Sequence, residues 1–490
     1  MGTRVKLVLG AVWAVLGIAV LFSSAYAGTP PLATVRTYGG TQMDRGIAAF
    51  SSTGGSMNVV VFSREYGVGD NLNCLLSLDP GGGMTTATAF GGEGYEGPQV
   101  VRQTTDGFIM AGVFRNPPAL EVPDAVLMKV SANGVLQWQY AYGTGGYDGL
   151  FDVRATSDGG FIGVGSGSQI PDEVGTIDRI LLLKVDANGE LQWLKLLGDS
   201  AISGASSVLE LASGGYLLLS GAVNDGKVEV VLITTDADGN TVGQRSYGAP
   251  VHLSGRSMVA VDDGVVICGA AYENISRPFD AFLMKVDAAG EPAWYRQFGL
   301  PEFFEDASYL AQDRDGGFLL AGTTDGTTAG NVDVYLVKTD AAGILQWETH
   351  YGTSVRDVPT FLGVAPDGSY LITGYAVVQE SPTTDYDILV IKTVPPQVLF
   401  LRADSNVDGE VDLSDAVNTL THLFLGGAPL ACPDAADAND SGELDISDAI
   451  YTLGYLFLGS SPDPPEPYPL YGGDPTNDTL GCDRYPPSSR

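Results

Sequence analysis

Histidine is scarce in this chain: His252, His350 and His422 are the only three among 490 residues. None of them lies in a metal or triad motif. The sequence also lacks G-x-S-x-G, H-E-x-x-H and phosphate-loop patterns. We therefore assign no catalytic residue. The sequence favours a non-catalytic protein but does not exclude an enzyme, because spacing does not reveal which carboxylates pair for glycoside cleavage.

Basic residues are few as well. Lys and Arg total 25 against 59 Asp and Glu, which gives a formal net charge of −34. Such an acidic chain is unsuited to nucleic acid or to anionic membranes, both of which attract basic surfaces. It favours cations or solubility in salt. Charged residues make up only 17% of the chain and glycines number 65, a balance typical of turn-rich, all-β proteins.

Four cysteines are too few to scaffold a chain of this length. Cys74 and Cys268 lie in strand-like apolar runs and are expected to be small buried hydrophobes. Cys432 and Cys482 bracket an acidic C-terminal region. We predict that this second pair forms a disulfide in an oxidising compartment.

Long apolar runs are absent except near the start, between Leu7 and Phe22. Basic residues precede this run, and the A-x-A motif Ala25–Ala27 follows it. This order predicts a cleaved signal peptide over 1–27, the alternative being an uncleaved anchor. The run is shorter than the ~20 residues of a membrane span. We expect a soluble protein that is secreted, extracellular or at the cell surface, with no membrane span after cleavage.

A repeated unit fills the middle of the chain. An aromatic residue or Leu followed by Gly recurs seven times, about 50 residues apart, at Tyr38, Phe90, Tyr142, Leu197, Tyr247, Phe298 and Tyr351. Each unit contains apolar runs separated by Asp-Gly, Asn-Gly or Ala-Gly turns, as in "VRATSDGGFIGVGSGS" and "ILLLKVDANGELQWLKLLG". Glycine supplies the positive φ that such turns need. The pattern predicts four strands per unit.

This period predicts an all-β fold, a seven-bladed β-propeller over 32–394 with four-stranded blades. The rival interpretations are an array of sandwiches or an open solenoid. The last unit has only three strands, whereas an extra strand, "LATVRTYGG", precedes the first. Pairing of these two ends closes the ring and removes exposed edges. The unit resembles the "SDGGF…LLxKxDxxGxxxW…YGG" propeller repeats of secreted bacterial proteins.

Two sets of propeller residues invite a functional interpretation. The repeated Trp138, Trp193, Trp294 and Trp347 could stack on sugars or pack between blades, and their regular recurrence favours packing. A series of acids follows the anchors: Asp44, Glu96, Asp148 and Asp357, with Asp306 close by. These acids either ring a cation or ligand site at the channel mouth or cap tight turns. A carbohydrate or a protein is the ligand expected on this face.

The C-terminal region carries a different signal, "DSNVDGEVDLSDA". Oxygen-bearing residues occupy loop positions 1, 3, 5, 9 and 12, Gly409 occupies position 6, and position 7 offers a backbone carbonyl. This spacing suits a hard cation such as Ca²⁺. The pattern recurs 33 residues later, with Gly442 at the turn. The predicted ligands are Asp404, Asn406, Asp408, Glu410, Asp412 and Asp415, then Asp437, Asn439, Ser441, Glu443, Asp445 and Asp448.

Each loop precedes a similar apolar segment, "LSDAVNTLTHLFLGG" or "ISDAIYTLGYLFLGS", with helical spacing and a following Gly. The paired loop–helix units resemble type I dockerins and the C-terminal modules of planctomycete-type secreted proteins. The resemblance implies a small α-helical, calcium-stabilised docking module over 403–490 with a Pro-rich tail, after a linker over 395–402. Ser441 replaces a carboxylate, so we expect the second calcium site to be the weaker one.

In dockerins the residues before the last ligand contact a cohesin. The resemblance therefore implies partner-binding roles for Leu413, Ser414, Ile446 and Ser447, with a cohesin-like or other protein as the partner. Together these features predict an exported, non-catalytic binding or scaffolding protein. Its propeller presents a ligand-binding face, and its C-terminal module tethers it to a protein or a cell surface. The alternative is a secreted polysaccharide-degrading propeller enzyme, a lyase or glycosidase, on the same tether.

Overall fold

A computed structural model describes residues 32–485, except 40–42, 52–54, 64–71, 92–94, 116–121, 170–176, 199–201, 203, 249–250, 274–278, 301, 327–331, 380–384, 394–399, 460, 472–473, 475, 477–479 and 483–484. The predicted signal peptide, 1–27, lies outside these residues. The chain forms two compact units that divide between Val394 and Pro395. Within the described residues, no helix is both long enough and apolar enough to cross a membrane.

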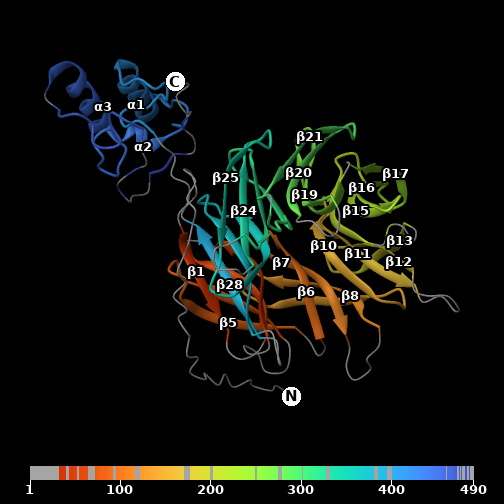
Figure 1. Ribbon diagram of the computed structural model, residues 1–490. Helices are drawn as coiled ribbons and strands as arrows, with labels where there is room; N and C mark the ends of the chain where they lie inside the picture. The colour runs from red at the N-terminus through yellow and green to blue at the C-terminus, as the bar shows by residue number, and fades with distance from the viewer. Residues whose placement is uncertain are drawn as a thin grey trace. The chain divides into compact units, whose positions relative to one another are not determined.

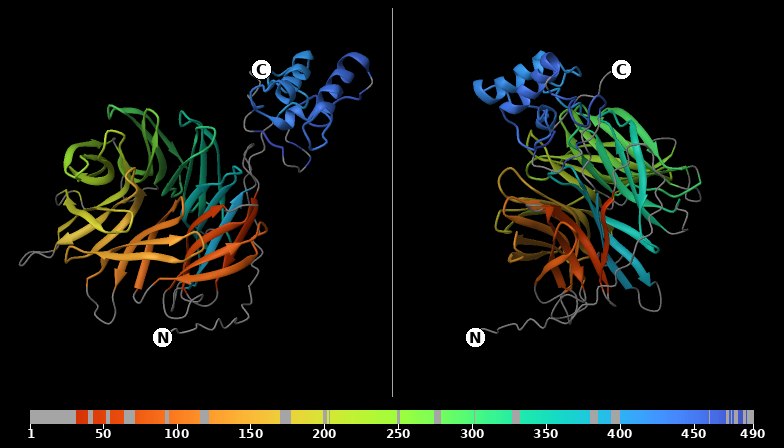
Figure 2. Two further views of the ribbon diagram at one scale, coloured as in Figure 1. Left: turned by 180° about the vertical axis from the view of Figure 1, so that it is seen from behind. Right: turned by 90° about the vertical axis from the view of Figure 1, so that its left-hand side faces the viewer.

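The first unit is a β-propeller of seven four-stranded antiparallel sheets (Figures 1 and 2). The first strands of the blades contact one another around the ring and so lie innermost. They are β2 (Asp44–Ser51), β6 (Tyr95–Thr104), β10 (Asp148–Ala155), β14 (Ala205–Glu210), β18 (His252–Val261), β22 (Tyr309–Gln312) and β26 (Arg356–Val364).

The other three strands of each blade follow outward in sequence order, except that the last blade has β1 as its outermost strand. The second strands are β3 (Met57–Ser63), β7 (Gly107–Arg115), β11 (Phe161–Gln169), β15 (Tyr216–Asn224), β19 (Gly264–Tyr272), β23 (Phe318–Thr324) and β27 (Tyr370–Gln379). The third are β4 (Leu72–Leu78), β8 (Asp124–Ser131), β12 (Ile177–Val185), β16 (Lys227–Thr235), β20 (Asp280–Asp287), β24 (Asp333–Thr339) and β28 (Asp385–Thr393). The outermost are β5 (Met84–Phe90), β9 (Leu136–Tyr142), β13 (Leu191–Leu197), β17 (Thr241–Tyr247), β21 (Pro292–Phe298), β25 (Leu345–Tyr351) and β1 (Leu32–Tyr38).

The ring closes through the first strand of the chain. β1 pairs antiparallel with β28, so that Thr34 lies opposite Lys392 and Tyr38 opposite Ile388. Figure 1 shows this pair, with β1 in red beside β28 in blue. The predicted propeller, its seven blades and its closure by the N-terminal strand are therefore confirmed. The alternatives of a sandwich array and an open solenoid are excluded.

The apolar core lies between neighbouring blades rather than in one central cluster. Ile47 of β2, for example, packs in one cluster with Val101, Met110 and Met128 of the next blade. The tryptophans reinforce these junctions. A Cβ on Gly239 or on Gly343, both turn residues of the following blade, would lie 2.7 Å from the ring of Trp193 or Trp294. These rings therefore pack against the next blade.

The Asp-Gly turns are held by the repeated lysines of the third strands. Lys184 contacts Asp158 at 2.8 Å, and Lys338 contacts Asp315 at 2.7 Å, in each case within one blade. The lysine side chains are almost fully buried, whereas these aspartates are about half exposed. Each ion pair therefore ties the first turn of a blade to its third strand.

The second unit is small and contains short helices: α1 (Leu413–Leu425), α2 (Pro433–Ala436), α3 (Ile446–Leu453) and a π-helical turn, η2 (Gly454–Leu458). A disulfide joins Cys432 to Cys482. Its core contains Phe400, Leu401 and Tyr485. The linker predicted over 395–402 thus ends in residues that are buried in this unit.

Candidate metal centre in the C-terminal unit

The first acidic loop is folded around the carboxylate of Asp404, which is fully buried. Its Oδ1 accepts from the amide of Asp408 at 3.1 Å, and its Oδ2 accepts from the amide of Gly409 at 2.7 Å. Val407 and Gly409 have positive φ values of 59° and 89°. These two left-handed residues bend the chain so that loop positions 5 and 6 present their amides to position 1.

The end of this loop is also the start of α1. Asp412 is the N-cap, and its Oδ1 accepts from the amide of Ser414 at 2.7 Å. Asp415, three residues on, reaches back and accepts from the amides of Asp412 at 2.8 Å and Asn406 at 3.2 Å. This capping box places the carboxylates of positions 9 and 12 at the positive end of the helix.

The second loop repeats this construction. Asp437 accepts from the amides of Ser441 at 3.0 Å and Gly442 at 2.8 Å. Asp440 and Gly442 have positive φ values of 58° and 77°, again at positions 4 and 6. Asp445 caps α3 through Ser447, and Asp448 reaches back to the Asp445 amide at 2.9 Å. The two loops therefore share a backbone path as well as a sequence pattern.

Burial and mutual repulsion shift the pKa values of the inward-facing carboxyls. Burial raises the pKa of Asp415 to about 7, and the Asp404 and Asp408 charges add to the shift. Burial likewise raises the pKa of Asp448 to about 7, with a further contribution from Asp437. Two clustered carboxylates that water does not reach need either a shared proton or a cation.

Unpartnered oxygens mark the second loop in particular. Oδ1 of Asp448 and Oδ1 of Asn439 are buried and accept no hydrogen bond, and the Asp448 side chain is fully enclosed. Ser441 Oγ lies 3.1 Å from the Glu443 carbonyl, so the oxygens of positions 5 and 7 also come together. Buried oxygens without donors are costly, and a hard cation would satisfy them.

The donor set limits what the loops can hold. Among the described residues, no three His, Cys, Asp or Glu side chains converge closely enough to form a metal-ligand cluster. Each loop instead joins two buried acids, Asp404 with Asp415 or Asp437 with Asp448, to amide, hydroxyl and carbonyl oxygens. Such an all-oxygen mixture is what Ca²⁺ accepts, and it lacks the nitrogen and sulfur that zinc prefers.

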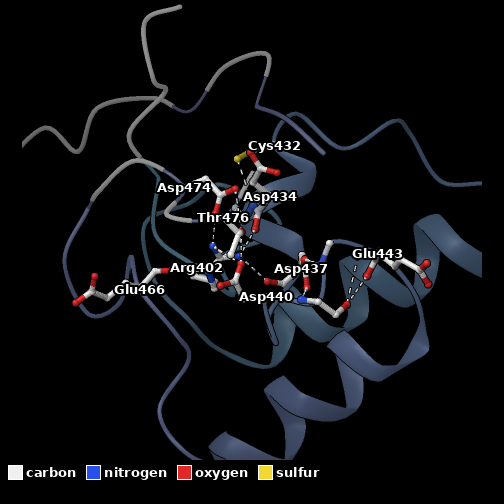
Figure 3. A network of polar contacts seen from close by, with 12 residues as sticks. Arg402, Cys432, Asp434, Asp437, Asp440, Glu443, Glu466, Asp474 and Thr476 are labelled. Carbon is white, nitrogen blue, oxygen red and sulfur yellow. Dashed lines mark hydrogen bonds and ion pairs between the residues drawn. The ribbon is translucent and has the colours of Figure 1, made fainter. Parts of the chain in front are cut away.

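The Pro-rich tail is built into the second unit through Arg402, the largest of the side chains that are buried there (Figure 3). The Arg402 guanidinium contacts the carboxylates of Asp440 at 2.9 Å and Asp474 at 2.6 Å. It also donates to the carbonyls of Asp437 at 3.0 Å and Glu466 at 2.9 Å. One side chain from the predicted linker thus joins the second loop to the tail. No pattern in the sequence indicated this role.

The residues predicted to bind a partner lie at the surface. Leu413 and Ile446 are about half exposed, at 51% and 48%. Ser414 and Ser447 are exposed but accept from the side chains of Asn406 at 2.6 Å and Asn439 at 2.8 Å, which ties them to the loops. Sequence reasoning missed further exposed apolar side chains, which match in pairs between the two repeats: Val417 and Ile450, Phe424 and Phe457, Leu425 and Leu458.

The acids at the propeller blade junctions mostly cap turns. The Thr144 and Thr353 hydroxyls donate to Asp148 and Asp357, each at 2.9 Å. In the sixth blade, Glu305 occupies the equivalent position, rather than the expected Asp306. The evidence is that the Glu305 amide donates to the Phe279 carbonyl of the preceding blade at 2.9 Å. Burial raises the pKa of Glu305 and of Asp357 to about 7. The Glu96 side chain lies outside the described part of the chain.

No protein-family model matches this chain, and none of the curated proteins is similar to it in sequence. Among solved structures, puromycin hydrolase shares 14% identity over 76% of this chain and 59% of its own length, with a TM-score of 0.44. An endo-arabinase from Bacteroides thetaiotaomicron shares 11% identity over 49% and 92%, with a TM-score of 0.33. Prolyl oligopeptidase B from Galerina marginata shares 11% over 74% and 54%, with a TM-score of 0.40. Similarities this distant carry no argument about function.

Proposed function

We propose that this chain is an exported, non-catalytic binding protein whose C-terminal unit holds two calcium ions and docks to a protein partner or a cell surface. The observation that carries the proposal is the repeated loop geometry. Both loops wrap a buried position-1 carboxylate with the amides of positions 5 and 6, and both end in a capping box. A repeated oxygen-lined loop with a buried carboxylate at each end fits a hard cation.

The first calcium ion would lie among Asp404, Asn406, Asp408 and Asp415, and the second among Asp437, Asn439, Ser441 and Asp448. The carbonyls of Glu410 and Glu443 would complete the two sets, while Asp412 and Asp445 would act mainly as helix caps. Bound calcium supplies positive charge that offsets the buried carboxylates. Ser441 brings no charge, which supports a weaker second site.

The docking role is supported by apolar side chains that remain exposed on α1, α3 and η2. Leu425 and Leu458 are 79% and 76% exposed. A unit of this size needs most of its large apolar side chains for its core, so their exposure is notable. They recur at matched positions with Phe424 and Phe457. Contiguous exposed apolar residues of this kind mark interaction surfaces. The arrangement resembles a dockerin, so a cohesin-like protein is the partner class we propose.

Calcium titration of the full-length chain after chelation tests the first part. We expect Asp404→Asn and Asp437→Asn each to abolish one bound ion, with the Asp404 site the tighter of the two. Asp463→Asn, an exposed acid outside both loops, is the matched control and should change nothing. Circular dichroism should show helix gained as calcium is added. Unchanged binding in the double variant would refute the calcium sites.

The docking role needs its own test. Leu425→Asp with Leu458→Asp should leave calcium binding and the unfolding temperature unchanged, because both side chains already face solvent. The same pair should abolish binding to a cohesin domain, or retention on the surface of the producing cell. Turnover of polysaccharide by the unaltered chain would instead favour a tethered lyase or glycosidase.

A further inference from the structure

Three blade junctions of the propeller share one construction. At each junction an acidic residue lies near the start of one blade. Its backbone amide donates to a carbonyl of the preceding blade, that of the residue just before the third strand. The three pairs are Asp148 with Pro123 at 2.8 Å, Glu305 with Phe279 at 2.9 Å and Asp357 with Val332 at 2.7 Å. Each acid therefore lies beside the carboxylate that opens that third strand, which is Asp124, Asp280 or Asp333. Two like charges meet at each junction.

A glycine leaves room for two of these pairs. A Cβ on Gly352 would lie 2.3 Å from Oδ1 of Asp333 and 2.9 Å from Oδ2 of Asp357. A Cβ on Gly299 would lie 2.8 Å from Oε2 of Glu305 and 3.4 Å from Oδ1 of Asp280. Oxygens of both acids therefore face one small space above the glycine, and any side chain there would fill it.

The junctions differ in how the buried acid is satisfied. At the first and third, a threonine directly after the glycine, Thr144 or Thr353, donates its hydroxyl and its amide to the acid. At the second junction Leu300 takes the place of this threonine. Glu305 is only 1% exposed, and its Oε1 accepts from the Thr324 hydroxyl at 3.0 Å. Its Oε2 has no hydrogen-bond partner of good geometry, although the nearby Leu300 amide partly opposes the effect of burial on the Glu305 pKa.

A buried carboxylate oxygen without a donor, beside a second carboxylate, is costly unless a positive group is present. No ion pair joins Asp280 or Glu305 to a Lys or Arg in the described residues. Asp325 lies near enough to add to the negative potential at Glu305. The second junction thus lacks the threonine hydroxyl that donates to the buried acid at the other two junctions.

The geometry points to a calcium site at this junction, between the fifth and sixth blades, with Glu305 Oε2 and Asp280 Oδ1 as its protein ligands. Asp280 is only partly buried, so water reaches the pair from its side and supplies further ligands. Ca²⁺ tolerates such an irregular, partly hydrated set, whereas Mg²⁺ demands near-octahedral geometry. The site involves no residue of the C-terminal unit and would brace two blades of the propeller.

Equilibrium dialysis of the full-length chain against calcium alone tests this assignment. We expect Glu305→Gln and Asp280→Asn each to remove one bound ion and to leave unchanged the ions that Asp404→Asn and Asp437→Asn remove. Failure of the C-terminal sites and failure of this one are therefore distinguishable. The matched control is Asp357→Asn, at a junction where threonine satisfies the acid, and it should retain every ion.

A further variant, Leu300→Thr, keeps all the carboxylates, so it is independent of any folding defect in Glu305→Gln or Asp280→Asn. Leu300→Thr supplies the hydroxyl that the other junctions use and should weaken calcium binding at Glu305 by tenfold or more. Equal binding by the unaltered chain, Glu305→Gln and Asp280→Asn would overturn the proposal. So would uptake of a single proton by the unaltered chain in place of the ion.

Discussion

The hydroxyl of Tyr485 donates a hydrogen bond to Oδ2 of Asp404, although 81 positions separate the two residues. The same oxygen accepts from the Gly409 amide. The tail of the chain therefore helps to set the first residue of the first acidic loop. Because both donors favour the charged carboxylate, they oppose the effect of burial, which raises the Asp404 pKa.

Tyr485→Phe should therefore destabilise the C-terminal unit by about 1.5–3 kcal/mol, the usual worth of a hydrogen bond to a charged group. It should also weaken calcium binding at the first loop several-fold, since the position-1 carboxylate becomes harder to ionise. Urea unfolding followed by far-ultraviolet dichroism measures the first effect, and calorimetry measures the second. Tyr471→Phe removes a hydroxyl from the neighbouring ring but leaves the Tyr485–Asp404 hydrogen bond in place, so it is the matched control for loss of a tyrosine hydroxyl. An equal effect of both variants would contradict the role of the hydroxyl.

The Cys432–Cys482 disulfide closes a loop over a sequence separation of 50 residues. Replacing both cysteines by Ser should lower the free energy of unfolding of the C-terminal unit by roughly 3–4 kcal/mol, through the greater entropy of the unfolded chain. The propeller should keep its own unfolding temperature. Differential scanning calorimetry with and without reductant reports both transitions. Loss of the propeller transition would be inconsistent with two independent units.

The Arg402 guanidinium is 1% exposed and contacts two carboxylates that are 14% and 18% exposed. Arg402→Met should cost about 3 kcal/mol, because Asp440 and Asp474 keep their charges without a partner. The exposed pair Arg245–Glu291 is the matched control. There, Arg245→Met should have little effect on stability, because solvent screens the exposed pair. Chemical denaturation of the two variants gives the comparison, and similar losses would argue against the network.

The stability of the propeller should depend on pH through Asp357. Burial raises its folded-state pKa from 3.8 to about 7, with a contribution from the nearby Asp333 charge. Between these values the folded protein holds a proton that the unfolded chain has lost. The contribution of Asp357 to stability therefore falls as pH rises from 4 to 7, by at most about 1.4 kcal/mol per pH unit, and Glu305, whose pKa is also raised to about 7, adds a contribution of the same sign.

Asp357→Asn should flatten this part of the stability profile, which urea melts at a series of pH values would record. The exposed Asp238→Asn should leave the slope as it is in the unaltered chain. A slope that persists unchanged in Asp357→Asn would assign the proton to another group.

The blade count and the ring closure were predictable because each repeat carries its own turn signals. An Asp-Gly or Asn-Gly turn needs glycine wherever it occurs. Its recurrence along the chain therefore marks the repeats and defines the repeat length. The equivalence of Glu305 to Asp148 was not predictable in the same way. One additional residue between Gly299 and the acid shifts the count, and only the backbone pairing with Phe279 reveals which acid takes the position.

In the C-terminal unit, too, some features were predictable from the sequence and others were not. Spacing alone indicated the sharp turns at Gly409 and Gly442, both of which have a positive φ, whereas the set of calcium ligands remains a prediction. Helical periodicity did not tell which apolar residues are buried. Ala416 and Ala449 are enclosed, whereas Val417 and Ile450 next to them face solvent. Arg402 gave no signal because its partners, Asp440 and Asp474, come from segments that only the folded unit brings together.

The pairing of β1 with β28 has a consequence for biosynthesis. Because β1 is made before its partner, it stays unpaired until β28 has been made, and the ring closes only then. A copy clipped just after Tyr38 would lose β1 and leave Ile388–Thr393 of β28 as an open edge, ready to accept the same segment from another molecule. Proteolysis near the N-terminus would then convert single molecules into strand-exchanged assemblies.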